Sequence, residues 1–385
     1  MTRLDELIQK LCPDGVEYNR LDEISVMKRG TSITKKDIMT GDVPVISGGK
    51  EPAYYCDSYN RDGETITVAG SGAGAGFVQY WQYPIFVCDA FSITGTDEVL
   101  TKYLYYFLTN IQEYIYSTKK GGGVPHVHIS SIAHVKVPVP PLEVQREIVR
   151  ILDNFTELTA ELTAELTSRK KQYEFYRDKL LTFGDNVSKV ALGDIFDIRN
   201  GYTPSKANPE YWTGGTVDWF RMEDIRMNGH VLSSALQKVT EAAIKGGRKI
   251  PANSIALSTS ATIGEHALIT VECLGNQRFS FFTPKAAFAN IIDMRFVNYY
   301  FYKVDEWCKG HLFQGNFNSV DMGALKQLRV PIPTVSEQNR IVSILDRFDT
   351  LCNDISEGLP AEIEARQKQY EYYLDKLLSF KELKP

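Results

Sequence analysis

The sequence has no long apolar run. No stretch of its 385 residues approaches the roughly 18 consecutive apolar side chains that a membrane-spanning helix needs. Residues 1–6 also lack the apolar core of a secretory signal. We therefore expect a cytoplasmic protein with no membrane partner.

Cysteine is scarce and scattered. The six cysteines are Cys12, Cys56, Cys88, Cys273, Cys308 and Cys352. No two lie within four residues of each other, which excludes a zinc knuckle or a redox pair and favours separate, reduced thiols. His126 and His128 could supply two metal ligands, but nothing near them in the sequence completes a set. We expect no metal site.

Catalytic motifs are missing as well. Residues 70–76 are glycine-rich but lack the Lys-Ser/Thr of a phosphate-binding loop and the glycine spacing of a dinucleotide site. We expect a tight loop there whose backbone can approach a partner such as DNA closely. Residues 208–211 resemble an amino-methyltransferase motif only faintly, since its second proline is absent. No nucleophile–base pair stands out, so no catalytic residue is assigned.

Basic residues are in the minority, with 43 Lys and Arg against 48 Asp and Glu and a net charge of -5. This balance argues mildly against a nucleic-acid partner, because phosphate neutralisation needs Lys and Arg. The basic residues nevertheless cluster at 28–29, 35–36, 119–120 and 245–249. Lys or Arg beside flexible glycine can follow a phosphate backbone, although each cluster alone also fits a solvated face.

The strongest feature is an internal repeat. Residues 137–155 recur as residues 330–348, 193 positions later, with ten of nineteen identical. Residues 171–181 recur as residues 368–378, 197 positions later, with nine of eleven identical. The second copy therefore holds four extra residues between these two blocks. The regions before the repeats match only weakly, as in Phe91-Ser92 and Phe279-Ser280. Such a pattern suits a protein that reads two different targets, and it also fits a duplication whose variable regions have drifted.

Each conserved repeat predicts a long helix. Between residues 143 and 183 no Gly or Pro occurs, and apolar residues recur every three or four positions. About forty residues at ~1.5 Å each make a rod of about 60 Å, and its apolar stripe needs a partner. We expect that partner to be the second repeat, with a kink or break at Gly358, Leu359 and Pro360. The residues predicted to pack between the helices are Ile148, Leu152, Phe155, Leu162, Tyr173, Leu180, Ile341, Leu345, Phe348, Tyr370 and Leu377. A plain helix pair without a spacing role stays open.

The first helix also carries a short tandem repeat. Thr-Ala-Glu-Leu occurs at residues 159–162 and again at 163–166. Four residues turn a helix by roughly 400°, so one unit more or less keeps the apolar stripe on nearly the same face. The repeat can therefore change the length of the helix without breaking its packing.

The variable regions predict an α+β fold. Short runs rich in strand-forming residues, such as 65–68 and 83–88, alternate with Gly, Asp and Asn, and helices are predicted over 101–116 and about 290–309. We set the boundaries at residues 1–140 for the first variable region, 141–185 for the first helix, 186–333 for the second variable region and 334–385 for the second helix.

This plan resembles the specificity subunits of Type I restriction-modification systems over essentially the whole chain. The resemblance is carried by residues 137–142 with Gln145 and residues 148–153, by residues 171–181, and by their copies. Residues 11–16, Leu-Cys-Pro-Asp-Gly-Val, also look like a common opening in this family.

The resemblance implies two target-recognition domains, separated by two antiparallel coiled-coil helices and related by a pseudo-twofold repeat. Each domain would read one half of a split double-stranded DNA target, while the helices set the spacing and dock two modification subunits. Those methyltransferase subunits would bind S-adenosylmethionine and methylate adenine, and restriction subunits with ATP- and Mg-dependent translocation could join them. The chain itself would hold no cofactor and would not be an enzyme.

Local chemistry guides the choice of DNA-contacting residues, since the variable regions give no residue-by-residue match to the family. In the first region they are Lys28, Arg29, Lys35, Lys36, Ser71, Lys119, Lys120 and His126. In the second region they are Arg199, Lys206, Arg221, Lys245, Arg248, Lys249, Ser260 and Arg278.

Three alternatives stay open at this point. One is a specificity subunit of a modification-only complex. Another is an enzyme such as a fused nuclease–methyltransferase, against which the missing motifs count. The third is a coiled-coil scaffold, against which the two large variable regions count.

Overall fold

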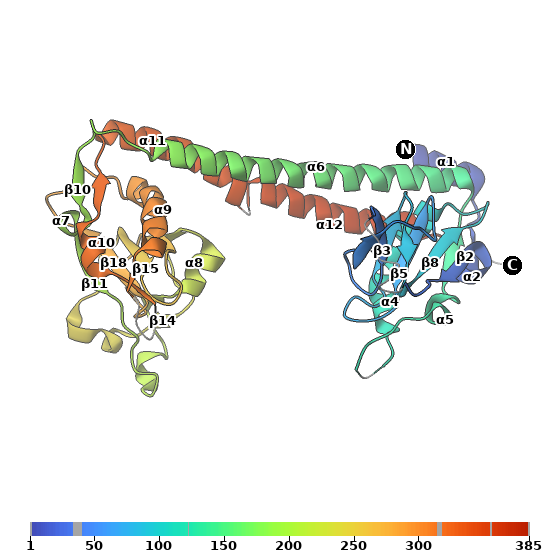
Figure 1. Ribbon diagram of the computed structural model, residues 1–385, viewed down its shortest axis with the longest axis horizontal. Helices are drawn as coiled ribbons and strands as arrows, with labels where there is room; N and C mark the ends of the chain where they lie inside the picture. Colours follow the sequence, from blue (N-terminus) through green and yellow to red (C-terminus); the bar gives the residue numbers. More distant parts are fainter. Residues whose placement is uncertain (1, 34–40, 122, 314–317, 355, 384–385) are drawn as a thin grey trace. The chain divides into compact units, whose positions relative to one another are not determined.

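The computed structural model describes residues 2–33, 41–121, 123–313, 318–354 and 356–383. Its contacts divide the chain into two units (Figure 1). Unit 1 comprises residues 1–164 and 361–385, and unit 2 comprises residues 165–360. The first long helix belongs partly to each unit. Lys35 and Lys36 lie outside the described residues.

Unit 1 is an α+β unit. Its helices are α1 (Arg3–Leu11), α2 (Leu21–Ile24), α3 (Thr101–Asn110), α4 (Gln112–Ser117), α5 (Ile129–Ile132), the first part of α6 (Leu142–Leu180) and most of α12 (Leu359–Leu378). Its strands are β1 (Glu17–Arg20), β2 (Ser25–Arg29), β3 (Val43–Ile46), β4 (Tyr54–Cys56), β5 (Thr65–Ala69), β6 (Val78–Trp81), β7 (Phe86–Val87), β8 (Ala90–Gly95) and β9 (Lys136–Val139).

Unit 2 is also an α+β unit. Its helices are the rest of α6, α7 (Leu192–Ile195), α8 (Met222–Asn228), α9 (Met294–Gly310), α10 (Met322–Gln327) and α11 (Val335–Asn353). Its strands are β10 (Lys189–Ala191), β11 (Phe196–Asn200), β12 (Val217–Phe220), β13 (Val231–Leu232), β14 (Lys238–Val239), β15 (Ser254–Ser258), β16 (His266–Ile269), β17 (Cys273–Gly275), β18 (Phe279–Pro284), β19 (Leu312–Phe313), β20 (Ser319–Val320) and β21 (Arg329–Pro331). Short 3₁₀ turns span Pro209–Tyr211, Glu241–Ala243 and Lys245–Gly247.

The two units share one strand connectivity. The order β2-β8-β5-β6 in unit 1 corresponds to β11-β18-β15-β16 in unit 2, with every neighbouring pair antiparallel. A second sheet centres on β3, antiparallel to β4 and parallel to β7, and its counterpart centres on β12 between β14 and β17. The repeat therefore continues through the regions whose sequences have diverged.

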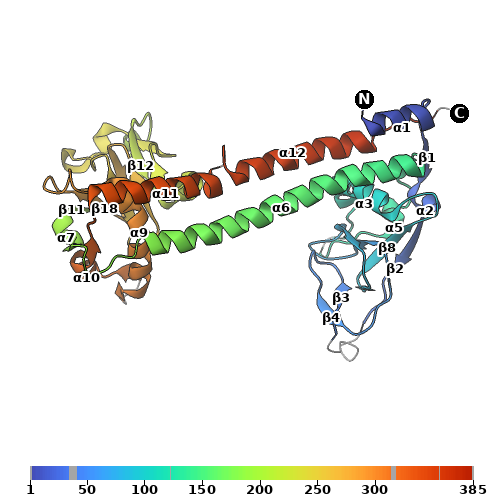
Figure 2. The same cartoon turned by 90° about the horizontal axis from the view of Figure 1, so that it is seen from above.

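The helices of the conserved repeats form largely where the apolar spacing predicts them. Helix α6 is continuous over Leu142–Leu180, whereas α11 ends at Asn353 and α12 begins at Leu359 (Figure 2). The break is built around Gly358, since a Cβ there would lie 2.4 Å from the carbonyl oxygen of Thr350. The predicted interruption at residues 358–360 is therefore confirmed.

Within each unit, α6 packs against part of the second repeat. In unit 1, Ile148 and Leu152 are fully buried in a core that includes Leu374 and Leu378, and α6 and α12 run in opposite directions (Figures 1 and 2). Full burial stabilises such side chains by roughly 2 kcal/mol each. The other residues predicted to pack there are Phe155, stacked 5.4 Å from Tyr373, and the partly buried Tyr370 and Leu377.

The same arrangement recurs in unit 2 with α11. Tyr173, Ile341 and Leu345 are buried in one core, with Leu180 and Phe348 packed against it. The rings of Tyr173 and Phe348 lie 6.2 Å apart. Leu162 is half-buried on α6.

A buried glutamine joins each long helix to its unit. Gln145 is fully buried; its Oε1 accepts from the Leu100 N–H at 2.9 Å and its Nε2 donates to the carbonyls of Glu98 and Pro140 at 3.0 and 2.7 Å. Gln338, its copy, makes the matching three bonds to Asp293, Ile291 and Pro333. The repeated glutamine thus joins the start of its long helix to the same loop, residues 98–100 or 291–293, in each unit.

A repeated aspartate adds a second tie, eight residues further along each helix. Asp153 accepts from the Tyr106 hydroxyl at 2.5 Å and pairs with Lys102 at 2.8 Å. Asp346 accepts from the Tyr299 hydroxyl at 2.8 Å and pairs with Arg295 at 2.8 Å. Each tie links a long helix to the helix, α3 or α9, that covers the sheet.

Two sequence predictions of local structure are wrong in detail. The helix predicted over residues 101–116 is interrupted at Ile111, between α3 and α4. Gln112 donates to the Gly76 carbonyl at 2.7 Å and accepts from the Val78 N–H at 3.1 Å, which ties the start of α4 to the β5–β6 connection. The strand predicted over 83–88 covers only Phe86–Val87.

Candidate nucleic-acid interface

In unit 1, three of the predicted contact residues meet at one loop cluster. The Lys120 N–H donates to the His126 carbonyl at 2.9 Å and the His126 N–H donates back to Lys120 at 2.8 Å. Ser71 forms a bridge with His126 on its other side, and its hydroxyl donates to Asp89. The loops after β5, before β8 and after α4 are therefore held together by short polar contacts.

The glycine-rich segment 70–76 serves this loop packing. A Cβ on Gly74 would lie 2.4 Å from the Gly48 carbonyl oxygen, and Gly76 has a φ of +85°. Both positions therefore favour glycine for backbone reasons. The close approach predicted for this loop is to another loop of the same unit.

The other cations of unit 1 lie on exposed or partly exposed surface. Lys28 and Arg29 are exposed at the end of β2. Lys119 lies with its ammonium 4.1 Å from the centre of the Tyr116 ring. Arg61, which the sequence analysis missed, donates to the Arg29 carbonyl at 2.9 Å and to the Ser92 hydroxyl at 2.7 Å. Burial lowers the pKa of the Arg61 guanidinium.

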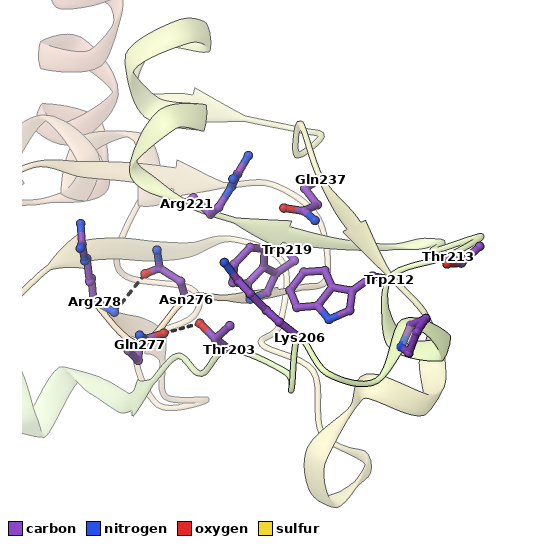
Figure 3. Close-up of a pocket in the computed structure, with 11 residues that line it drawn as sticks. Thr203, Lys206, Trp212, Thr213, Trp219, Arg221, Gln237, Asn276, Gln277 and Arg278 are labelled. Carbon is purple, nitrogen blue, oxygen red and sulfur yellow. Dashed lines mark hydrogen bonds between the residues drawn. The ribbon is translucent and has the colours of Figure 1, made fainter.

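In unit 2, three predicted cations line a single pocket of about 610 Å³. They are Lys206, Arg221 and Arg278, which come from three separate parts of the sequence (Figure 3). We call this the tryptophan–arginine pocket. Its other lining residues are Thr203, Pro209, Trp212, Thr213, Trp219, Gln237, Asn276 and Gln277.

Two tryptophans build one wall of this pocket. The rings of Trp212 and Trp219 lie 5.0 Å apart at 85° to each other. The Trp219 indole N–H donates to the Tyr202 carbonyl at 3.0 Å, and the Trp212 indole N–H donates to the Ser205 carbonyl at 3.0 Å. Both rings are therefore fixed before any ligand arrives.

Arg221 and Gln277 are also held in place. The Arg221 guanidinium lies 5.8 Å from the centre of the Trp219 ring and pairs with Glu223 at 2.9 Å. Its buried Nε has no hydrogen-bond partner among the described residues. The Thr203 hydroxyl donates to the side-chain oxygen of Gln277. Figure 3 shows the side chains of Arg221 and Arg278 extending in the same direction.

A smaller hollow of about 280 Å³ gathers three more of the predicted cations, Arg199, Lys245 and Arg248. Tyr202 lines this hollow, and its N–H donates to the Gly275 carbonyl at 2.7 Å. The next residue, Thr203, lines the tryptophan–arginine pocket, so two consecutive residues contribute to the two hollows.

The two remaining predicted residues of this region lie elsewhere. Lys249 pairs with Glu241 at 2.7 Å, and that hydrogen bond raises the pKa of the ammonium. Ser260 bridges to Ser319 after β15. The charge of Lys249 is thus already balanced within the unit.

The residues that sequence reasoning missed in unit 2 are mainly uncharged. Trp212, Trp219, Gln237 and Gln277 complete the pocket, but no spacing pattern links them in the sequence. The parallel pairing of β12 with β17 places Phe220 opposite Gly275, which brings Trp219 and Arg221 beside residues 276–278. Residues 208–211 form a capped turn, in which the Asn208 side chain accepts from the Glu210 N–H at 3.1 Å.

Two other kinds of site are absent from the part of the chain that the structure describes. No group of three or more His, Cys, Asp and Glu side chains could hold a metal ion. Within the same residues, no helix has both the length and the apolar character needed to cross a membrane.

Both surfaces present hydrogen-bond donors to a ligand. The tryptophan–arginine pocket offers three cations, amide groups and aromatic rings, with no carboxylate among its lining residues. The loop cluster of unit 1 offers Lys120 and the partly buried His126 beside a carboxylate. Such surfaces suit a polyanion whose bases also present acceptors.

The chain belongs to the family of the Type I restriction modification DNA specificity domain, which it matches over residues 13–169 and 184–365. It is 35% identical to the Type I restriction enzyme EcoR124I/EcoR124II specificity subunit of Escherichia coli, over 99% of this chain and 97% of that one. This finding confirms the resemblance seen in the repeats.

One further sequence and one solved structure are also similar to this chain. The EcoprrI specificity subunit of Escherichia coli is 47% identical, over 54% of this chain and 53% of that subunit. The crystal structure of a Type I restriction-modification S subunit from M. genitalium matches with a TM-score of 0.59 at 17% identity, over 94% of this chain and 96% of that one. At this identity the match shows a shared fold.

Proposed function

We propose that this chain is the DNA-reading subunit of a Type I restriction-modification complex, with each variable region reading one half of a bipartite duplex target. One observation carries the proposal: the two units share the same strand connectivity but present different surfaces. Unit 1 presents the loop cluster around Lys120 and His126, while unit 2 presents the tryptophan–arginine pocket. A common frame with different loops suits two different half-sites.

The long helices act as spacer and docking surface in this proposal. We infer a pseudo-twofold arrangement in which antiparallel helices separate the two target-recognition domains. The best-preserved repeat exposes an aromatic residue at the same position in both copies, Phe175 at 62% and Tyr372 at 61% exposure. Exposed large aromatics are typical anchors of protein interfaces. A surface that occurs twice in one chain suits two copies of the same modification subunit.

The chemistry belongs to the partners. We propose that this chain holds no cofactor and catalyses no step, while the modification subunits bind S-adenosylmethionine and restriction subunits use ATP and Mg. The assembly would work in the cytoplasm. Because the chain has a net charge of -5, we also propose that partner subunits supply much of the positive field that DNA requires.

The experiment is a binding competition on a pool of random duplexes, with and without the modification subunits. The isolated chain should bind weakly and without preference. The complex should select one bipartite sequence, with an affinity that falls as salt rises. Tight, sequence-specific binding by the isolated chain would contradict the role assigned to the partners, and absence of any selected sequence would contradict the function itself.

Docking is tested separately by size-exclusion chromatography of the complex. Replacing Phe175 and Tyr372 together by Ala should remove both modification subunits, and either single change should remove one. The matched control replaces their exposed neighbours Glu174 and Glu371 by Ala, which should leave the assembly intact. Unchanged stoichiometry in the aromatic double variant would place docking elsewhere.

A further inference from the structure

We propose that the tryptophan–arginine pocket reads a guanine in one half-site, with Arg221 selecting the base and Lys206 and Arg278 binding the phosphates around it. This inference rests on the proposed function and assigns roles within the surface of unit 2. It predicts a property of the DNA target, namely a G·C pair at a defined position.

The charged part of the pocket lining presents only donors. Lys206, Arg221 and Arg278 are the charged lining residues, and no carboxylate joins them. In the major groove, guanine presents two acceptors, N7 and O6, whereas cytosine presents a donor and adenine presents one of each. Guanine is therefore the base whose edge best matches this lining.

Arg221 has the order that base reading requires. Its guanidinium is held by the Trp219 ring and by the ion pair to Glu223, and its side chain is only 32% exposed. The ion pair to Glu223 engages Nη2, while Nη1 has no hydrogen-bond partner among the described residues, so a donor of the fork is left over after folding. A fixed, planar donor fork matches the two acceptors of guanine with a more defined geometry than a flexible ammonium does.

Gln277 supports the same choice. Because its side-chain oxygen is held by the Thr203 hydroxyl, its amide NH₂ is left to donate. No described residue accepts from that NH₂ group. A second oriented donor in the same pocket favours acceptors on a neighbouring base pair as well, which are guanine N7 and O6, adenine N7 or thymine O4.

Lys206 and Arg278 have the opposite character. Both are exposed, and neither side chain forms an ion pair with a described residue. Long, exposed cations in the lining of a reading pocket suit phosphates, which fix register and affinity without sequence information. The pocket thus divides into an ordered reading part and an exposed anchoring part.

The test uses the full chain assembled with its modification subunits and a pool of duplexes that is randomised across the target. The bound fraction is sequenced for the wild-type chain, for Arg221→Gln and for the control Arg226→Gln. Arg226 lies five residues further on, in α8, and pairs with Glu265 outside the pocket. The wild type should require guanine at one position of one half-site.

Arg221→Gln should abolish that single preference and leave the other half-site unchanged. Affinity for the wild-type target should fall about 5- to 150-fold, the range expected for one bidentate base contact. Arg226→Gln should change neither preference. If Arg221→Gln does not fold, Arg221→Lys keeps the charge without the fork and should weaken the same preference.

The anchoring part is tested by Lys206→Ala combined with Arg278→Ala. Affinity should fall for every sequence alike, and the slope of log K against log salt should become shallower by roughly two, since each lost phosphate contact removes about 0.9. Retention of the guanine preference in both Arg221 variants, or a change confined to the other half-site, would overturn the inference while leaving the proposed function standing. A wild-type complex that selects no bipartite sequence would overturn both.

Discussion

The buried glutamine of each repeat allows a sharp test of how the long helices are joined to their units. We consider Gln145→Met, which keeps the length of the side chain but removes its amide. Gln145 makes three hydrogen bonds in a fully buried position, so water cannot replace any of them. The substitution leaves the Leu100 N–H and two carbonyls without their partner.

The expected cost follows from those three bonds. A typical intramolecular hydrogen bond contributes about 1 kcal/mol net, so the variant should lose about 3 kcal/mol of local stability. Methionine fills nearly the same volume, which keeps the cavity contribution small. An energy of 3 kcal/mol corresponds to roughly a 150-fold change in the equilibrium between closed and open states.

Hydrogen exchange followed by mass spectrometry measures this effect region by region. Peptides that cover residues 96–101 and the start of α6 should exchange faster by up to that factor, while peptides of α9 and α11 should stay unchanged. Gln338→Met should give the converse result in unit 2, because its three bonds are equivalent. The control is Gln367→Met, an exposed glutamine of α12 for which a change below about 0.5 kcal/mol is expected. Equal acceleration in both units, or none in either, would refute the reasoning.

Three further predictions concern the spacer, the loop cluster and pH. Deleting residues 163–166 should shorten α6 by ~6 Å, since each residue of a helix rises ~1.5 Å. The unread gap between the two half-sites should then shorten by about one base pair while both half-sites stay the same. Methylation mapping of the variant complex measures the gap, and an unchanged gap would refute the spacer role. Replacing Lys119 and Lys120 by Ala should weaken binding to all DNA about equally in salt-dependent binding assays, whereas loss at a single base position would indicate base reading. Burial lowers the pKa of His230 below 6.5, so unit 2 should lose stability as pH falls from about 6.5 towards the folded-state value. Unfolding measured against pH should show this loss in the wild type and not in His230→Gln.

The long helices were predictable because their signal is local and occurs twice. Apolar residues at helical spacing predicted a helix over residues 143–183, and the observed helix is Leu142–Leu180. Gly358 and Pro360 marked the break of the second copy for reasons of backbone geometry alone. No comparable local signal marks Ile111, where a single glutamine, Gln112, bonds to a distant loop and the helix is interrupted.

The site was predictable only in its charges. Clustered basic residues are visible in a sequence, and Lys206, Arg221 and Arg278 do line one pocket. The partners that give the pocket its order, Trp219 and Gln277, are 58 residues apart and meet only through the pairing of β12 with β17. Strand pairing of this kind depends on tertiary contacts that no short window contains.

Charge alone also says little about which cations are available to a ligand. Lys249 belongs to the same sequence cluster as Lys245 and Arg248, yet it pairs with Glu241, eight residues before it. The other two line a hollow together with Arg199. A basic cluster in the sequence therefore predicts a positive region, and the structure is needed to say which of its members remain available.

In each repeat, the residues that fix the long helix to its unit differ from the residues proposed to contact DNA. Gln145 and Asp153 fix the first helix to unit 1 through buried or partly buried bonds, and their copies Gln338 and Asp346 bond in unit 2 to residues at the equivalent positions of the repeat. Bonds of this kind tolerate little change, since a buried donor without its acceptor is costly. Among the described residues, the side chains of Lys120 and Arg221 make no hydrogen bond or ion pair to the long helices. A frame held by a few buried polar ties can therefore keep its geometry while its reading surfaces diverge, which explains why the helical segments match so closely and the variable regions hardly at all.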